Sequence, residues 1–207
     1  MGRPVGRVES PPGSGPLFHG VFRGRRVLLT GHTGFKGSWC ASWLLRLGAE
    51  VYGYALAPPT EPSLFDTLGL AARLDHELGD VRDAEAVARR VEATRPDLVL
   101  HMAAQPLVRC SYAEPVATFA TNVVGTATVL DGVRRAGRPC AVICVTSDKC
   151  YEESGAPRRH REEDRLGGFD PYAASKASAE LVIAAYRRSF FDTGPRDVKL
   201  ASVRAGN

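Results

Sequence analysis

Short apolar runs alternate with longer amphipathic segments from Arg25 onward. Val27-Leu28-Leu29-Thr30 and Ala141-Val142-Ile143-Cys144-Val145 are continuous apolar runs, which are typical of strands buried on both faces of a sheet. Residues Ala84–Ala93 instead gather their apolar side chains on one helical face, after an Asp83 suited to capping a helix. The pattern predicts strands at 27–30, 50–56, 77–78, 97–102, 140–146 and 198–203, and helices at 38–47, 64–74, 84–93, 116–135 and 171–191.

Strands that alternate with helices imply parallel βαβ units. We therefore expect an α/β domain with a doubly wound parallel sheet, the Rossmann fold. Residues 1–21 differ from the rest, because they are rich in Gly, Pro, Ser and Arg and lack periodicity. We expect 1–21 to be a disordered extension and 22–207 to be the folded domain.

Composition and charge exclude several classes of protein. With 207 residues, 44% of them apolar and 24% charged, the chain has the composition of a soluble globular protein. A net charge of +4 is small for this length and argues against a nucleic-acid or membrane-surface binder. We see no run of membrane-span length and no apolar signal core, so we expect a cytoplasmic protein. The cysteines lack metal-ligand spacing, so we expect reduced structural thiols and no metal site at Cys40, Cys110, Cys140, Cys144 and Cys150.

A glycine-rich turn joins the first predicted strand to the first predicted helix, Gly31-His32-Thr33-Gly34-Phe35-Lys36-Gly37. Glycines let a backbone approach a pyrophosphate closely, and the following helix N-terminus offers N–H donors and a favourable dipole. The strand–turn–helix context makes this turn a candidate dinucleotide site. We expect Gly31, Thr33, Gly34, Phe35, Lys36 and Gly37 to bind the cofactor.

The second predicted strand lacks the carboxylate that would contact the adenosine ribose about 20 positions on. It also lacks arginines suited to a 2′-phosphate. This absence slightly favours NAD over NADP but does not decide between the two cofactors. Asp80 and Val81, after the third predicted strand, are candidates for the adenine edge. The alternative for Asp80 is a turn that leads into the next helix.

Two groups of residues carry the candidate chemistry. Thr146-Ser147-Asp148-Lys149 ends a predicted strand, and Tyr172 and Lys176 lie one turn apart on a predicted helix. An ammonium beside a phenol favours the phenolate, which can then act as a base. Together these residues indicate proton abstraction from an alcohol.

These motifs resemble those of the extended short-chain dehydrogenase/reductase family, and within it the nucleotide-sugar 4,6-dehydratases, in particular those that use CDP-glucose. The resemblance covers about Phe22–Asn207. It rests on Gly31–Trp39, Tyr54–Phe65, His101–Arg109, Asn122, Thr146–Tyr151 and Tyr172-x-x-x-Lys176.

The resemblance implies NAD as cofactor and a nucleotide sugar, here CDP-glucose, as substrate. Tyr172 would take the C4 hydroxyl proton while the C4 hydride leaves to NAD, with Lys176 lowering the phenol pKa and binding the nicotinamide ribose. Ser147 would bond the sugar oxygen. Asp148 would protonate the departing C6 hydroxyl. Lys149 stands where dTDP-glucose relatives have a Glu base, so it would either take the C5 proton as a neutral amine or stabilise the enolate as a cation.

Further residues are candidates through the same resemblance. Ala103 and Ala104 would lie against the cofactor. Gln105, Asn122, Arg204 and Asn207 would contact the substrate, with a solvent-facing helix amide as the alternative for Asn122. His101 either supports the cofactor loop or is a core histidine whose hydrogen bonds are satisfied within the fold, and we favour the second interpretation. We expect Trp39 and Trp43 to pack in the core.

In the resembling family a further strand and a smaller substrate lobe follow the residue corresponding to Asn207. We therefore expect a truncated NAD-binding domain whose own turnover is open, and a homodimer is compatible with the resemblance. Two other functions stay open: an NAD-binding pseudo-enzyme or regulatory module, and a nucleotide-sugar epimerase. Asp148 and Lys149 argue against the epimerase, which would need only Tyr172 and Lys176.

Overall fold

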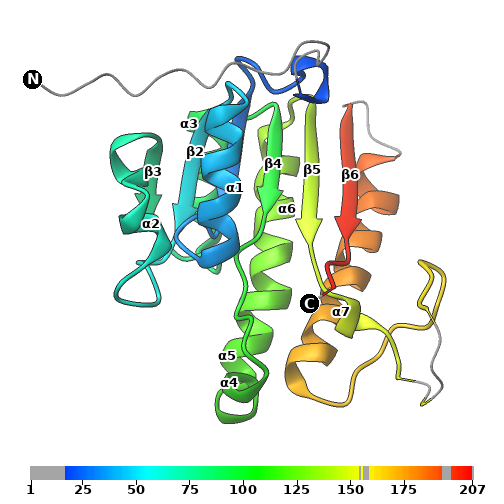
Figure 1. The fold of residues 1–207 in the computed structure, drawn as a ribbon. Helices are drawn as coiled ribbons and strands as arrows, with labels where there is room; N and C mark the ends of the chain where they lie inside the picture. Colours follow the sequence, from blue (N-terminus) through cyan, green and yellow to red (C-terminus); the bar gives the residue numbers. More distant parts are fainter. Residues whose placement is uncertain (1–16, 154, 156–158, 193–196, 207) are drawn as a thin grey trace, which may run out of the picture.

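The computed structural model describes residues 17–153, 155, 159–192 and 197–206. Six parallel strands form one sheet in the order β3-β2-β1-β4-β5-β6. The chain adds β2 and β3 on one side of β1 and then crosses over to add β4, β5 and β6 on the other side (Figure 1). This is the arrangement of a doubly wound fold, so the expected fold class is confirmed. The strands are β1 (Arg26–Thr30), β2 (Glu50–Ala55), β3 (Asp75–Leu78), β4 (Leu98–His101), β5 (Cys140–Val145) and β6 (Val198–Val203).

Helices pack on both faces of the sheet (Figure 1). α1 and α2 lie on one face, and α3, α6 and α7 lie on the other. The helices are α1 (Phe35–Arg46), α2 (Leu64–Thr67), α3 (Ala84–Thr94), α4 (Val108–Ala113), α5 (Pro115–Phe119), α6 (Gly125–Ala136) and α7 (Pro171–Tyr186). Short 3-10 turns lie at Leu17–Gly20, Leu70–Ala72 and Asp148–Cys150, and π-helical turns at Ala120–Val124 and Arg187–Phe191.

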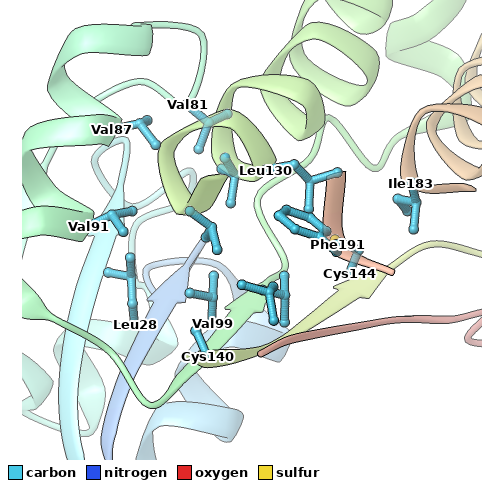
Figure 2. Packing of buried hydrophobic residues seen from close by; sticks show 14 of the residues in the cluster. Leu28, Val81, Val87, Val91, Val99, Leu130, Cys140, Cys144, Ile183 and Phe191 are labelled. Atoms are coloured by element: carbon cyan, nitrogen blue, oxygen red, sulfur yellow. The ribbon is translucent and has the colours of Figure 1, made fainter. Parts of the chain in front are cut away.

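The core divides into two layers because successive strand residues point to opposite faces. Val27 and Leu29 face α1 and α2, whereas Leu28 between them faces α3 and α6. Figure 2 shows the second layer, in which strand residues meet Val87 and Val91 of α3 and Leu130 of α6. Strands covered on both faces explain why their sequences are almost continuously apolar.

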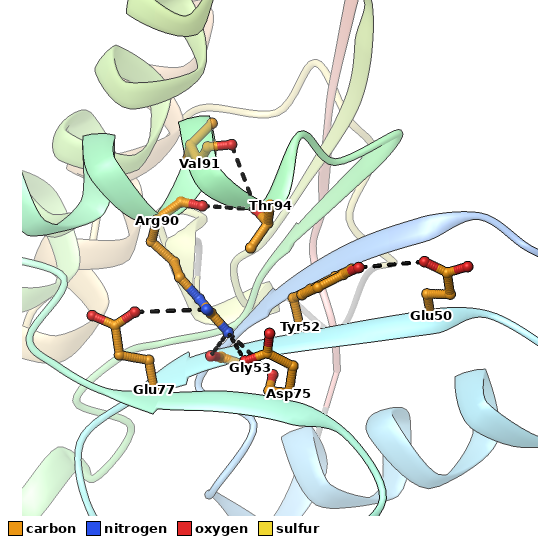
Figure 3. Close-up of polar contacts among 8 residues, drawn as sticks. All are labelled: Glu50, Tyr52, Gly53, Asp75, Glu77, Arg90, Val91 and Thr94. Atoms are coloured by element: carbon orange, nitrogen blue, oxygen red, sulfur yellow. Dashed lines mark hydrogen bonds and ion pairs between the residues drawn. The ribbon is translucent and has the colours of Figure 1, made fainter.

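A buried arginine ties α3 to the edge of the sheet (Figure 3). Arg90 is 9% exposed, and its Nη2 donates to the carbonyl oxygen of Gly53 at 3.2 Å and to Oδ1 of Asp75 at 3.0 Å. Its Nη1 lies 3.6 Å from a carboxylate oxygen of Glu77. The short, exposed strand β3 is therefore held from the helix side as well as by β2.

Local boundaries differ from the sequence prediction where backbone geometry intervenes. The predicted helix at 64–74 is split, because Gly69 adopts a left-handed φ of 58° between α2 and the following 3-10 turn. The extension predicted at 1–21 includes an ordered part, since Leu17–Gly20 form a turn and Phe18 packs edge-on against Trp43. Residues 1–16 lie outside the described residues. The expected burial of Trp39 and Trp43 is wrong: they are 56% and 52% exposed, because α1 turns them away from the sheet.

One described helical stretch, Pro115–Ala136, is long and apolar enough to cross a membrane by length and composition alone. Half of its most apolar window is buried in the fold, where α6 packs against α3 and α7. The stretch therefore also fits the core helix of a globular domain. The five cysteines are all unpaired, as expected, and Cys140, Cys144 and Cys150 are buried.

Candidate functional site

The phosphate loop between β1 and α1 has a backbone that only glycine permits. Gly31 has a φ of +78°, and a Cβ there would lie 2.7 Å from the backbone nitrogen of Ala103. A Cβ on Gly37 would lie 2.0 Å from the carbonyl oxygen of Gly31. Because neither glycine carries a side chain, the start of α1 can approach the end of β1 closely.

The N-terminus of α1 is open to an anion. The N-cap residue Gly34 has no side chain to accept a hydrogen bond from the first turn of the helix. The backbone N–H groups of Phe35, Lys36 and Gly37 are therefore available to donate to a ligand. Thr33 is buried and donates to the carbonyl oxygen of Leu56 at 2.8 Å, which fixes the loop to the end of β2. A glycine cradle beneath uncapped amides fits the diphosphate of a dinucleotide.

Asp80 and Val81 follow β3 at the same edge of the sheet. Arg82 grips the Asp80 carboxylate, with Nη2 at 2.6 Å from Oδ2, and these hydrogen bonds hold the Asp80 pKa below its usual value. Val81 is buried against Gly125, where a Cβ would come within 2.8 Å of a Val81 methyl. The two residues lie in the turn between β3 and α3, and their contact with an adenine stays a prediction.

The turn after β4 carries Ala103 and Ala104, both half-buried. Thr30, the last residue of β1, accepts hydrogen bonds at its hydroxyl from the amides of Met102 at 3.1 Å and Ala103 at 3.2 Å. The phosphate loop and this turn are thus joined at neighbouring carboxyl ends of the sheet, where ligands bind in doubly wound folds.

Tyr172 and Lys176 lie in the first two turns of α7, which Asp170 caps by accepting from the amide of Ala173 at 2.9 Å. Both side chains are 6% exposed. The ammonium of Lys176 donates to the carbonyl oxygen of Val145 at 3.4 Å, and burial lowers the Lys176 pKa to about 8. The helix spacing therefore delivers both candidate groups to the end of β5.

The expected lowering of the Tyr172 pKa by Lys176 is wrong for this arrangement. Burial raises the pKa of the phenol, the negative charge of Asp148 adds to the rise, and the hydroxyl of Ser147 opposes it. The Lys176 ammonium is directed at Val145 instead. A phenol in this setting donates a hydrogen bond more readily than it ionises.

Ser147, Asp148 and Lys149 form a tight turn directly after β5. The Ser147 hydroxyl donates to Oδ1 of Asp148 at 3.0 Å and accepts from the amide of Lys149 at 3.2 Å. The Asp148 amide donates to the carbonyl oxygen of Ala205 at 3.1 Å. Ser147 is buried, Asp148 is half-buried and Lys149 is exposed, so the described residues do not bury the Lys149 amine.

Asn122 and Gln105 are engaged inside the fold. Asn122 is 2% exposed, which rules out the solvent-facing alternative. Its side chain accepts from the Gln105 amide at 2.8 Å and donates to the Gln105 carbonyl oxygen at 3.1 Å and to the hydroxyl of Ser175 at 2.9 Å. Gln105 bonds Leu107 and Thr118 with its own amide group. In this structure both residues shape the turn, and a direct substrate contact stays a prediction.

Arg204 is committed to a buried ion pair. Its Nη2 lies 3.0 Å from Oε2 of Glu180, and its Nη1 donates to the hydroxyl of Tyr151 at 2.8 Å and to the carbonyl oxygen of Glu162 at 2.8 Å. The pair links β6 and α7 to the segment after the Ser147 turn. Asn207, the other predicted substrate residue near this end, lies outside the described residues.

Two further residues of the site, Glu180 and Ser111, were not predicted from the sequence. Glu180 is 4% exposed and also accepts from the hydroxyls of Thr146 at 2.5 Å and Ser202 at 2.9 Å. Its position one helical turn beyond Lys176 was a readable signal. Ser111 accepts from the amide of Tyr172 at 3.1 Å, and no spacing rule predicts that contact across 61 positions.

Comparisons with known proteins agree with this geometry. The family model described as GDP-mannose 4,6 dehydratase matches residues 28–191. A CDP-glucose 4,6-dehydratase from Salmonella typhimurium is 49% identical over 189 residues, which cover 90% of this chain and 53% of that relative. A dTDP-glucose 4,6-dehydratase from Mycolicibacterium smegmatis is 32% identical over 168 residues, 80% of this chain and 50% of the relative.

A solved structure of similar fold is the DesIV double mutant, a dTDP-glucose 4,6-dehydratase from Streptomyces venezuelae with NAD and DAU bound. It superposes with a TM-score of 0.73 at 30% identity and covers 86% of this chain and 54% of that one. The chain spans about half the length of the curated relatives it matches. Because the family model covers most of the folded chain, including the phosphate loop and the Tyr172/Lys176 helix, the chain belongs to the GDP-mannose 4,6 dehydratase family.

Proposed function

We propose that the chain is the cofactor-binding and catalytic half of an NAD-dependent nucleotide-sugar 4,6-dehydratase, a hydro-lyase that converts CDP-glucose to CDP-4-keto-6-deoxyglucose. The observation that carries the proposal is the 49% identity to a CDP-glucose 4,6-dehydratase along 90% of the chain. The glycine cradle at Gly37 and the uncapped start of α1 suit the diphosphate of NAD. A bound NAD would supply the hydride acceptor for C4 of the sugar and the hydride donor for C6.

Tyr172 is the group proposed to take the C4 hydroxyl proton, which it can do only as the phenolate, the form that burial disfavours in this structure. Its phenol lies close enough to Ser147 for the serine hydroxyl to lower its pKa. The Ser147 hydroxyl has one hydrogen, which it donates to Asp148 in this structure; to assist the reaction it would turn that hydrogen to the phenol oxygen or to the reacting sugar oxygen. Lys176, buried with a pKa of about 8, is proposed to bind the nicotinamide ribose and to supply positive charge near the reacting oxygen.

Asp148 and Lys149 are proposed to carry out the elimination of water. Asp148 is half-buried and accepts a hydrogen bond from the Ser147 hydroxyl at one carboxylate oxygen, and in its protonated form it would deliver a proton to the C6 hydroxyl. Lys149 either takes the C5 proton or stabilises the enolate. Solvent deuterium entering C5 in the Lys149→Met variant separates these roles: exchange at the wild-type rate contradicts a role as the base.

The finer assignments belong to the same proposal. We place the protein in the cytoplasm, in deoxysugar and lipopolysaccharide biosynthesis, and we expect a homodimer. The relative from Salmonella typhimurium is named a CDP-glucose 4,6-dehydratase, which supports the place in deoxysugar biosynthesis, because a 4,6-dehydration removes the C6 hydroxyl of the sugar. Size measurement of the purified chain in solution tests the dimer.

The direct test is to incubate the purified chain with NAD and CDP-glucose and to follow the sugar nucleotide by mass spectrometry. Loss of one water supports the dehydratase, and the loss should be absent from Tyr172→Phe while NAD still binds. A product of unchanged mass but altered sugar configuration favours an epimerase. Tight NAD binding without any product favours a binding or regulatory module, which stays open because the chain spans about half of its relatives.

A further inference from the structure

His101 lies at the end of β4, is 3% exposed, and has a hydrogen-bond partner at each ring nitrogen. Nδ1 lies 2.8 Å from the hydroxyl of Thr30, and Nε2 lies 3.1 Å from the hydroxyl of Thr126. The two threonines come from β1 and α6, on either side of the imidazole. A buried histidine that bridges two elements in this way can transmit the position of one element to the other.

The neighbouring donors and acceptors determine which ring nitrogen carries the proton. Thr126 donates its hydroxyl hydrogen to the carbonyl oxygen of Asn122 at 2.7 Å, so toward His101 it can only accept. Nε2 must therefore carry hydrogen. The Thr30 oxygen accepts from the amides of Met102 and Ala103, and its own hydrogen is free to bond Nδ1.

A protonated ring would break this pattern. Both nitrogens would then donate, the Thr30 oxygen would have to accept three hydrogens, and its own hydroxyl hydrogen would lose its acceptor. Burial and the charge of Lys176 also lower the His101 pKa to about 3. The geometry and the electrostatics thus agree on a neutral imidazole.

Each end of the chain of hydrogen bonds leads to part of the candidate site. From Thr30 it reaches the turn at Ala103, whose backbone packs against Gly31 of the phosphate loop. From Thr126 it reaches Asn122, whose side chain holds Gln105 and the hydroxyl of Ser175. Ser175 in turn donates to the carbonyl oxygen of Tyr172 at 2.7 Å.

We propose that His101 is a positioning residue: as the neutral Nε2–H tautomer it holds the 102–105 turn beside the cofactor loop in register with the helix that carries Tyr172 and Lys176. The inference rests on the proposed function for its catalytic meaning. Asn122 lies in a π-helical turn, which widens the helix locally and lets the side chain reach Gln105 and Ser175 together. The bridge sets how the dinucleotide site faces the phenol, although His101 touches neither reacting group.

The first test needs no substitution. Nitrogen-15 NMR of the histidine rings in the labelled full chain reports which nitrogen is protonated. We expect His101 to be the neutral Nε2–H form at neutral pH and to stay neutral on acidification to about pH 5. An Nδ1–H tautomer or an imidazolium at neutral pH overturns the proposal.

The second test measures amide hydrogen exchange and NAD affinity in His101→Leu and His101→Gln. Leucine removes both hydrogen bonds, so exchange at Ala103 and Gln105 should rise about tenfold while the amide of Val51, in the core of β2, changes little. The glutamine side-chain amide supplies both N–H donors and an acceptor oxygen and should restore most of the protection. A uniform rise that includes Val51, or a glutamine variant no better than leucine, contradicts a positioning role.

Thr126→Val and Thr94→Val form a matched pair. Both threonines are buried on helices and bond the carbonyl oxygen four residues back, at 2.7 Å for Thr126 and 2.8 Å for Thr94, but only Thr126 also meets His101. Thr126→Val should weaken NAD binding about tenfold, like His101→Leu, and the double variant should lose little more. Equal effects of the two valine variants contradict the proposal. A wild-type chain that binds no NAD contradicts the proposed function, while exchange and the tautomer still decide the role of His101.

Discussion

Replacing Gly37 by alanine forces a methyl group into the backbone of the phosphate loop. The new Cβ would lie 2.0 Å from the Gly31 carbonyl oxygen, 2.8 Å from its carbon and 2.9 Å from the Cα of His32. An ordinary carbon–oxygen contact is about 3.3 Å, so the loop and α1 must separate by roughly 1 Å. The backbone of Gly31 cannot move away from the new methyl group easily, because it packs against the backbone of Ala103.

The cost of this overpacking is about 1–3 kcal/mol. For a domain of this size that lowers the midpoint of thermal unfolding by about 2–4 °C per kcal/mol. The separation also moves the first-turn amides of α1 away from a bound diphosphate. NAD affinity should therefore fall about tenfold to a hundredfold, since each 1.4 kcal/mol is a factor of about ten.

Tryptophan fluorescence offers the assay, because Trp39 lies two positions beyond Gly37 on the same helix. NAD titration gives the affinity, and thermal unfolding gives the stability. Gly34→Ala is the control for stability: its backbone has a φ of −75°, and its Cβ would meet only the Gly31 carbonyl oxygen at 3.5 Å. If Gly37→Ala unfolds at the same temperature as Gly34→Ala and binds NAD like the wild type, the close approach of α1 to β1 is refuted.

Three further substitutions test the electrostatics and packing around the site. Lys176 has a folded-state pKa of about 8 against 10.5 for an ordinary lysine, so between pH 8 and 10.5 the unfolded chain binds more protons than the folded chain. The free energy of unfolding of the wild type, measured in urea relative to Lys176→Met, should therefore rise with pH over this range. A difference between the two proteins that does not change with pH contradicts a buried Lys176 ammonium. For Glu180, burial disfavours the carboxylate, but hydrogen bonds from Arg204, Thr146 and Ser202 outweigh it and lower the pKa; Glu180→Gln should cost up to about 3–5 kcal/mol at neutral pH, and the loss should shrink as the pH falls below about 4.3. The substitution Leu130→Ala, at a fully buried position of α6, should lower the free energy of unfolding by about 2–5 kcal/mol, and a loss below about 1 kcal/mol would show that α6 is loosely packed.

Several features of the site were readable along the chain because they depend on neighbours in sequence. The glycine spacing at 31–37 predicted a tight turn, and the structure shows backbone approaches that exclude a Cβ at Gly31 and Gly37. Tyr172 and Lys176 are one helical turn apart in α7, as their spacing predicted. Asp83 caps α3 by accepting from the amide of Ala86 at 3.0 Å. The contacts that determine Gly37, the Tyr172/Lys176 spacing and the Asp83 cap span only a few residues, whereas the approach that excludes a Cβ at Gly31 comes from the distant Ala103.

Other features depended on contacts between distant segments. Lysine at i+4 from a tyrosine predicted a lowered phenol pKa, but the direction of the Lys176 ammonium is set by the carbonyl oxygen of Val145, 31 positions away. Arg204 was expected to contact the substrate, which stays a prediction; its ion pair with Glu180 in this structure was not predicted. Trp39 and Trp43 look like core residues by type, and only the packing of α1 shows which side of that helix faces the sheet.

The sequence by itself determined the order of strands and helices, the glycine cradle and the identity of the groups at the carboxyl ends of the strands, because apolar periodicity and turn chemistry are local. Only the tertiary structure decided how those groups are bonded and charged. Hydrogen bonds such as those of His101 to Thr30 and Thr126 join residues 71 and 25 positions apart. Burial, which shifts the pKa values of Tyr172 and Lys176, exists only once the helices cover the sheet.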